Sequence, residues 1–160
     1  MPDNGPQPRI VLVDDEDMVL TSVRAFLSLE TDYEIDTFSN PLEAAADLEK
    51  TPADVVVSDY LMPPMTGLDL LRRAKQHQPA AARILLTGHA DKQSAIQAIN
   101  EVGLYQYLEK PWDNSQLLLV LNSAIERTQL LRTLEEKISL LDAAHGQIKE
   151  SQRRLIRAFL

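Results

Sequence analysis

Short apolar runs alternate with longer amphipathic segments along the first three quarters of the chain. The apolar runs predict strands at Ile10–Val13, Tyr33–Thr37, Val55–Ser58, Arg83–Thr87 and Tyr105–Glu109. The amphipathic segments predict helices at Asp17–Leu29, Pro41–Leu48, Gly67–Gln76 and Lys92–Asn100, and from about Asp113 onward. The first and third runs are continuously apolar and β-branched, as central parallel strands covered on both faces usually are. Five successive strand–helix pairs therefore predict a doubly wound α/β fold.

The last predicted helix is much longer than the others. After Asp113 the sequence has no proline and a single glycine, Gly146, so one helix could run nearly to the end of the chain. Such a helix of ~45 residues would be ~70 Å long. A heptad pattern places Ala124, Leu131, Ile138, His145, Gln152 and Phe159 at one seam position and Arg127, Leu134, Leu141, Ile148 and Leu155 at the other. We expect this arm to form a parallel coiled coil with a second copy, although an adjacent domain or another chain could also cover the stripe.

The composition narrows the function classes. The 160 residues are 44% hydrophobic and include no cysteine, which excludes disulfides, thiolate metal ligands and a cysteine nucleophile. Neither a signal peptide nor a run of about 18 apolar residues is present, so we expect a cytoplasmic protein without a membrane contact. Residues 1–125 carry 9 basic and 19 acidic residues, a net charge of −10, whereas residues 126–160 carry +2. The acidic part would repel a phosphate backbone, and we expect no direct nucleic-acid binding.

Polar residues gather where the predicted strands end. Asp14 and Asp15 follow the first strand, Asp59 the third, Thr87 ends the fourth, and Lys110 follows the fifth. Ligands of a parallel doubly wound sheet bind beyond the carboxyl ends of its strands. Three carboxylates held close together repel one another unless a divalent cation compensates, and Mg²⁺ prefers carboxylates, waters and phosphate oxygens. The sequence therefore predicts a Mg²⁺ site that receives a phosphoryl group.

These motifs together resemble the response-regulator receiver domains of two-component systems. The resemblance runs from about Arg9 to Arg127 and is carried by Asp14-Asp15, the loop Asp59-Tyr-Leu-Met-Pro-Pro-Met-Thr-Gly67, Leu86-Thr87-Gly88 and Lys110-Pro111. It implies a flavodoxin-like five-stranded parallel sheet of order 2-1-3-4-5. It also implies that a histidine kinase or a phosphotransfer protein donates the phosphoryl group. We accordingly expect a disordered leader at 1–8, a receiver domain at 9–127 and a coiled-coil arm at 128–160.

The resemblance assigns a role to each site residue. Asp59 would be the phosphoacceptor, assisted by Lys110 and Thr87. Thr87 and Tyr107 would be the switch residues, whose side chains move after phosphorylation and change the surface of the domain. Mg²⁺ or Mn²⁺ would be bound by Asp14, Asp15, Asp59 and the backbone carbonyl of Leu61. A cis peptide bond is expected before Pro111. Gly88 and Trp112 replace the alanine and phenylalanine that are frequent in the family, and neither change damages the site.

Other functions are less consistent with the sequence. A hydrolase of the haloacid-dehalogenase type needs a second aspartate two residues after its nucleophile, and this position is Leu61. His145 has no neighbours that identify a phosphotransfer histidine. A passive dimerisation scaffold remains an alternative. Because similar receivers precede cyclic-di-GMP enzymes, sensor kinases or activator ATPases, and the chain ends in apolar residues, we expect a signalling switch whose output domain lies outside this sequence.

Overall fold

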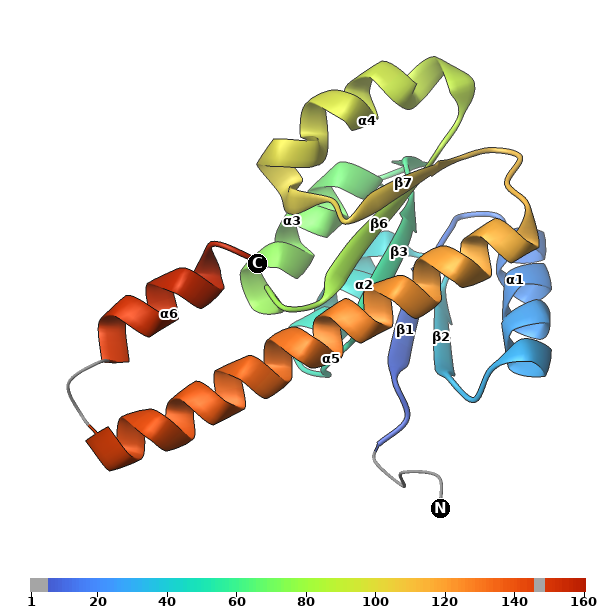
Figure 1. The fold of residues 1–160 in the computed structure, drawn as a ribbon. Coiled ribbons are helices and arrows are strands. Elements are labelled where there is room, and N and C mark those ends of the chain that lie inside the picture. The colour runs from blue at the N-terminus through green and yellow to red at the C-terminus, as the bar shows by residue number, and fades with distance from the viewer. Residues whose placement is uncertain (1–5, 146–148) are drawn as a thin grey trace.

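The computed structural model describes residues 6–145 and 149–160. Its centre is a parallel sheet of five strands, β1 (Arg9–Val13), β2 (Glu34–Phe38), β3 (Val55–Asp59), β6 (Ala82–Thr87) and β7 (Gln106–Glu109), in the order β2-β1-β3-β6-β7 (Figure 1). Two further strands, β4 (Leu61–Met62) and β5 (Met65–Thr66), form a small antiparallel hairpin after β3. Without that hairpin the order reads 2-1-3-4-5, which confirms the predicted fold.

Helices cover both faces of this sheet (Figure 1). On one face lie α1 (Asp17–Glu30) and α5 (Asn114–His145), and on the other lie α2 (Pro41–Leu48), α3 (Gly67–His77) and α4 (Lys92–Ala98). Successive residues of a strand point to opposite faces. In β1, Ile10 and Leu12 join the apolar cluster on the α1 side, whereas Val11 and Val13 join the cluster on the α2 side. Burial on both faces is why the strand is apolar at consecutive positions.

Local signals in the sequence fix several element ends. The side chain of Asn40 accepts a hydrogen bond from the Leu42 amide at 2.9 Å, and Pro41 follows as the first residue of α2. The peptide bond before Pro111 is cis, as expected. The sequence did not predict η1 (His89–Asp91), a short 3₁₀-helix, or η2 (Ile99–Gly103), a π-helix that follows α4. Of the helices in the described part of the chain, none could cross a membrane.

The C-terminal arm differs from the single long helix that the periodicity suggested. Helix α5 ends at His145, immediately before Gly146, and a second helix, α6 (Lys149–Arg157), returns along α5 (Figure 1). The guanidinium of Arg127 donates a 2.7 Å hydrogen bond to the carbonyl of Phe159. The single-helix prediction is therefore wrong. Residues 146–148, the side chain of His145 and most of the predicted leader lie outside the described residues.

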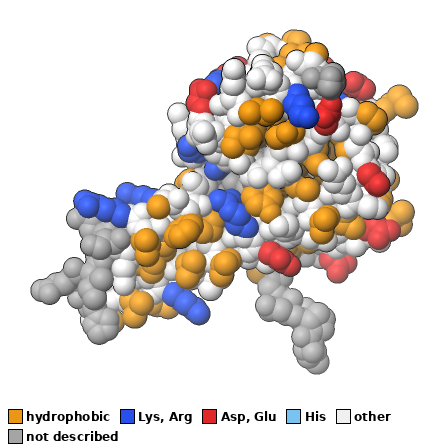
Figure 2. Space-filling view, turned by 45° about the horizontal axis from the view of Figure 1, so that its top comes forward, with side chains coloured by type: hydrophobic (Ala, Val, Ile, Leu, Met, Phe, Trp, Pro, Cys, Tyr) orange, Lys and Arg blue, Asp and Glu red, His pale blue; other side chains and the backbone are white. Residues whose placement is uncertain are grey.

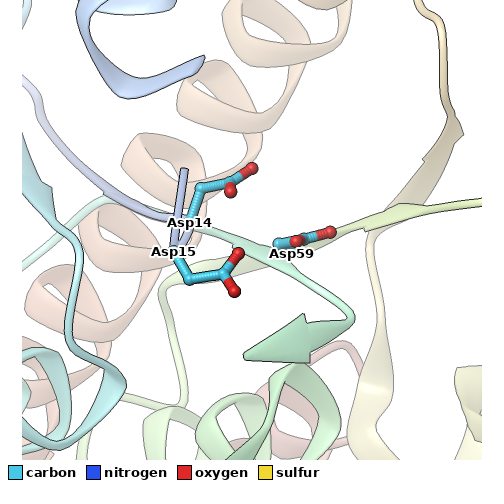
Figure 3. Close-up of side chains that lie close together, drawn as sticks. All are labelled: Asp14, Asp15 and Asp59. Atoms are coloured by element: carbon cyan, nitrogen blue, oxygen red, sulfur yellow. The ribbon is translucent and has the colours of Figure 1, made fainter. Parts of the chain in front are cut away.

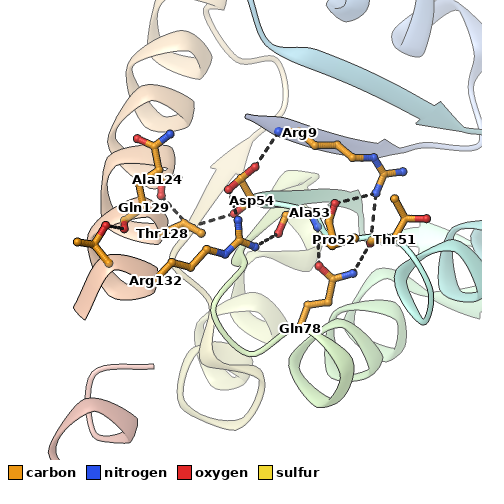
Figure 4. A network of polar contacts seen from close by, with 11 residues as sticks. Arg9, Thr51, Pro52, Ala53, Asp54, Gln78, Ala124, Thr128, Gln129 and Arg132 are labelled. Carbon is orange, nitrogen blue, oxygen red and sulfur yellow. Dashed lines mark hydrogen bonds and ion pairs between the residues drawn. The ribbon is translucent and has the colours of Figure 1, made fainter. Parts of the chain in front are cut away.

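A polar network fastens α5 to the end of the sheet opposite the predicted site (Figure 4). Asp54 accepts a 2.8 Å hydrogen bond from the Arg9 amide and forms an ion pair with Arg132 of α5. Arg132 also donates to the carbonyl of Ala53 at 2.7 Å, and Thr128 donates to the carbonyl of Asp54 at 3.0 Å. Asp54 and Thr128 are both buried. The arm is consequently attached to the sheet for at least one turn beyond Arg127.

Candidate functional site

Three aspartates meet at the carboxyl edge of the sheet (Figure 3). Asp14 and Asp15 follow β1 and Asp59 ends β3, and these two strands are neighbours. One carboxylate oxygen of each residue lies within 4.8 Å of the others. Asp14 is fully buried and Asp59 is nearly so, whereas Asp15 is exposed. The group is thus open to solvent on one side, and its all-oxygen donor set suits a hard divalent cation.

Asp14 is the most electrostatically unusual member of this group. Its Oδ1 accepts a 2.9 Å hydrogen bond from the Glu16 amide, but its Oδ2 is buried with no hydrogen-bond partner in the described part of the chain. Burial raises the pKa of Asp14 to about 6, and the charges of Asp59 and Asp15 act in the same direction, against the Glu16 amide and Lys110. A divalent cation would satisfy this oxygen and favour the ionised carboxylate. Asp14, Asp15 and Asp59 are therefore suitable ligands for Mg²⁺.

Lys110 supplies the positive charge beside the carboxylates. Its Nζ lies 2.9 Å from Oδ1 of Asp59 and 3.7 Å from Oδ2 of Asp14. Burial lowers the pKa of Lys110, but the hydrogen bond to Asp59 and the nearby carboxylates outweigh burial, so the net shift is upward and the amine stays charged. Oδ1 of Asp59 also accepts a 2.9 Å hydrogen bond from the Tyr60 amide. Both hydrogen bonds to this carboxylate from described residues fall on Oδ1, which leaves Oδ2 for a reacting group.

The start of α3 packs directly against the peptide unit of Asp59. The amide of Gly67 donates a 2.8 Å hydrogen bond to the carbonyl of Tyr60, and a Cβ atom at position 67 would lie 2.0 Å from the carbonyl oxygen of Asp59. The hydroxyl of Ser58 donates to that same oxygen at 3.0 Å. Neither Gly67 nor Ser58 was among the predicted site residues. The glycine at the loop–helix junction was the available signal, because close backbone approach is a common reason for one.

The remaining predicted site residues lie around this cluster. Thr87 is the last residue of β6, and its Oγ1 is buried without a hydrogen-bond partner among the described residues. Its carbonyl accepts a 2.7 Å hydrogen bond from the Lys110 amide. Tyr107 is half-buried on β7 and packs against the cluster on the α2 side. Leu61 begins β4, and the use of its carbonyl as a metal ligand stays a prediction, as do the individual roles.

Asp14→Asn is expected to stabilise the metal-free protein. The pKa of the Asp14 carboxyl is raised from 3.8 to about 6, so the folded state holds this proton more tightly than the unfolded state. The free energy of unfolding of the wild type therefore falls as the pH rises through that interval. In EDTA at pH 7, the free energy of unfolding of the variant should exceed that of the wild type by about 1–3 kcal/mol. Urea denaturation measures this difference. Below pH 4 the difference should vanish, and an equal difference at both pH values would contradict the explanation.

Comparisons with known proteins agree with this geometry. The family model of the response regulator receiver domain matches residues 10–122. The hydrogenase transcriptional regulatory protein HoxA of Cupriavidus necator is 32% identical over 120 residues, which are 75% of this chain and 24% of that protein. The DNA-binding transcriptional regulator NtrC of Salmonella typhimurium is 38% identical over 93 residues, 58% of this chain and 20% of that protein. The chain spans about a quarter or less of the length of these curated relatives.

Solved structures show the same fold. The structure described as adenylate cyclase from Rhodopirellula baltica superposes with a TM-score of 0.79 at 31% identity, covering 84% of this chain and 98% of that chain. The signal receiver domain of an HD domain-containing protein from Pseudomonas fluorescens gives a TM-score of 0.72 at 37% identity, covering 78% of this chain and 98% of that chain. Because the family model matches most of the length of this chain, the chain belongs to the response regulator receiver domain family.

Proposed function

We propose that this chain is the phosphoacceptor of a two-component system and that Asp59 receives its phosphoryl group from a histidine kinase or a phosphotransfer protein. The observation that carries the proposal is the arrangement of Asp14, Asp15 and Asp59 within 4.8 Å, with Lys110 only 2.9 Å from Asp59. Membership of the receiver family supports it. Oδ2 of Asp14 is buried without a hydrogen-bond partner among the described residues. An ordinary surface ion pair does not explain such an oxygen, whereas a site that binds a metal ion for phosphoryl transfer does.

The chemistry follows from the positions of these side chains. Oδ2 of Asp59 attacks the phosphorus of a phosphohistidine, an O–P bond forms as the P–N bond breaks, and the donor imidazole leaves, which gives an acyl phosphate. The positive charge of Lys110 then neutralises negative charge on one of the phosphoryl oxygens. Asp14, Asp15, Asp59 and the Leu61 carbonyl would hold Mg²⁺ or Mn²⁺, which would neutralise further charge on the phosphoryl group.

Intact mass spectrometry tests this proposal directly. The chain is incubated with acetyl phosphate and Mg²⁺, and one phosphoryl group is expected on the protein. Hydroxylamine should remove it, because hydroxylamine cleaves acyl phosphates and leaves phosphoserine and phosphothreonine intact. EDTA should prevent its addition. A chain that stays unlabelled with donor and Mg²⁺ would refute the proposal and favour a passive scaffold.

Thr87 and Lys110 are expected to act at different stages. Thr87→Ala keeps the carboxylates and the amine, so the variant should be labelled almost as the wild type is, whereas Lys110→Ala should slow labelling by about a hundredfold through loss of a charged donor. Because Thr87 contacts the new phosphate and Tyr107 follows it, Thr87→Ala should also weaken the backbone chemical-shift response to beryllofluoride. Equal and full responses in both variants would refute the assigned roles.

The proposal describes a switch rather than a turnover enzyme. Leu61 occupies the position where an aspartyl-phosphate hydrolase needs its general acid. The relatives include transcriptional regulators and a structure described as an adenylate cyclase, so we propose that the output domain lies outside these residues. We further propose that residues 128–160 pair two copies and that the chain itself binds no nucleic acid. Its cytoplasmic location stays a prediction.

A further inference from the structure

The arm already covers part of its apolar surface within one chain. Leu131 of α5 and Ile156 of α6 are buried, at 6% and 7% exposure, and Arg153 pairs with the buried Asp142 at 3.6 Å. A groove between the two helices is lined by Glu135, Ile138, Ser139, Arg153, Ile156 and Arg157. At the first seam position of the predicted coiled coil, Leu131 is therefore buried within one chain, and Ile138 lines the groove beside α6.

Other large apolar side chains of the arm are exposed among the described residues. Leu130, Leu134 and Leu141 are four and seven residues apart and share one side of α5. Leu155 lies on α6, and Phe159 lies two residues beyond the end of α6. None of these five residues lines the groove, and the carbonyl of Phe159 accepts a hydrogen bond from Arg127 of α5. We call the five residues the outer face. They are 41–65% exposed, and Figure 2 shows hydrophobic side chains gathered over this arm.

We propose that the outer face binds the outer face of a second copy, so that two α5–α6 hairpins form a four-helix bundle. This inference rests on the arm-mediated dimer proposed above and changes which residues make the contact. Two helices alone cannot enclose an apolar core, whereas two hairpins packed face to face can. A symmetric pair places each apolar residue against the same surface of the other copy.

Charge and area both favour a second copy as the occupant. Residues 126–160 carry a net charge of +2, whereas residues 1–125 carry −10, so two copies repel one another least when they meet through their arms. Burial of a leucine-sized side chain removes roughly 60–120 Å² from water, so the outer face offers about 250 Å² of apolar surface per copy. That area suits the apolar centre of an interface of about 800 Å² per partner, surrounded by a polar rim.

The attachment of α5 to the sheet gives this contact a defined direction. Thr128 and Arg132 hold the helix against Asp54 and Ala53, and Leu130 and Leu134 lie on the same turns. The outer face therefore begins on a segment that moves with the receiver. Truncation after Arg127 would remove these contacts as well as the arm, so substitutions within the full chain are the cleaner test.

Sedimentation equilibrium over a broad concentration range tests the outer face. The wild type is expected to rise from 18.0 kDa to twice that mass, whereas Leu155→Glu/Phe159→Glu and Leu134→Glu/Leu141→Glu should each weaken association at least tenfold. Leu29→Glu, at an 86% exposed leucine of α1, is the control and should associate as the wild type does. Circular dichroism and acetyl phosphate labelling verify that each variant is folded.

The α6 variant separates this inference from the coiled coil of α5 alone. If the α5 variant is monomeric and the α6 variant associates normally, the arm dimer stands and the outer face is overturned. A wild type that stays at 18.0 kDa overturns both the arm dimer and the outer face. The phosphoacceptor proposal is unaffected by either result, because labelling of Asp59 measures it independently.

Discussion

Asp59→Asn is expected to abolish phosphorylation of the chain by acetyl phosphate. The replacement has nearly the same shape and keeps an oxygen for the amides and amine around it, but its amide lacks the charge and nucleophilicity of a carboxylate. Asp59 is 7% exposed and Lys110 lies 2.9 Å from it, so the position that faces the donor is well defined. Intact mass after incubation with Mg²⁺ and donor should show no phosphoryl group.

The matched control for this experiment is Asp69→Asn. Asp69 lies in the first turn of α3, where it closes the capping box with Thr66, and its side chain is 48% exposed. The substitution removes the same charge close to the site without removing the proposed nucleophile, so labelling should proceed as in the wild type. If Asp59→Asn is labelled to the same extent as Asp69→Asn, another residue is the phosphoacceptor.

The arrangement of the site could be predicted because it depends on few long-range facts. Once the order of strands and helices is known, the ends of neighbouring parallel strands must converge. Asp14 follows one such strand directly, and Asp59 ends its neighbour. The roles proposed for them then rest on the chemistry of carboxylates and on the family resemblance. The close contact of Gly67 with Asp59 could not be predicted in the same way, because it depends on the path of the loop between them.

The arm shows the opposite case. Periodicity identifies an apolar stripe on a helix but does not identify what covers the stripe. Ile138 of that stripe lines a groove with Ile156 of the same chain. The ion pair between Arg132 and Asp54 joins residues 78 positions apart and leaves no local signal. Long-range pairing of this kind decides where α5 is attached, and the sequence alone therefore left both the return of α6 and the attachment unpredicted.

Gly67→Ala is expected to cause a large loss of stability. An added Cβ would lie 2.0 Å from the carbonyl oxygen and 2.9 Å from the carbonyl carbon of Asp59, and both are backbone atoms that cannot rotate away. Either the start of α3 or the end of β3 must move, and both are held by buried residues such as Leu70 and Val57. The free energy of unfolding should fall by about 3 kcal/mol or more, at the upper end of overpacking effects.

Gly88→Ala is the matched control, because it adds the same methyl group at another glycine beside the site. There the nearest atom to the new Cβ is Oδ2 of the Asp91 side chain at 3.5 Å, an ordinary contact, so the free energy of unfolding should change by no more than about 0.5 kcal/mol. Urea denaturation of both variants measures the difference.

Because the clash at position 67 displaces the peptide unit of Asp59, Gly67→Ala should also be labelled at least tenfold more slowly under conditions where it remains folded. Equal stability and equal labelling of the two variants would show that α3 can move away from β3 without cost, and that the close approach does not position the phosphoacceptor.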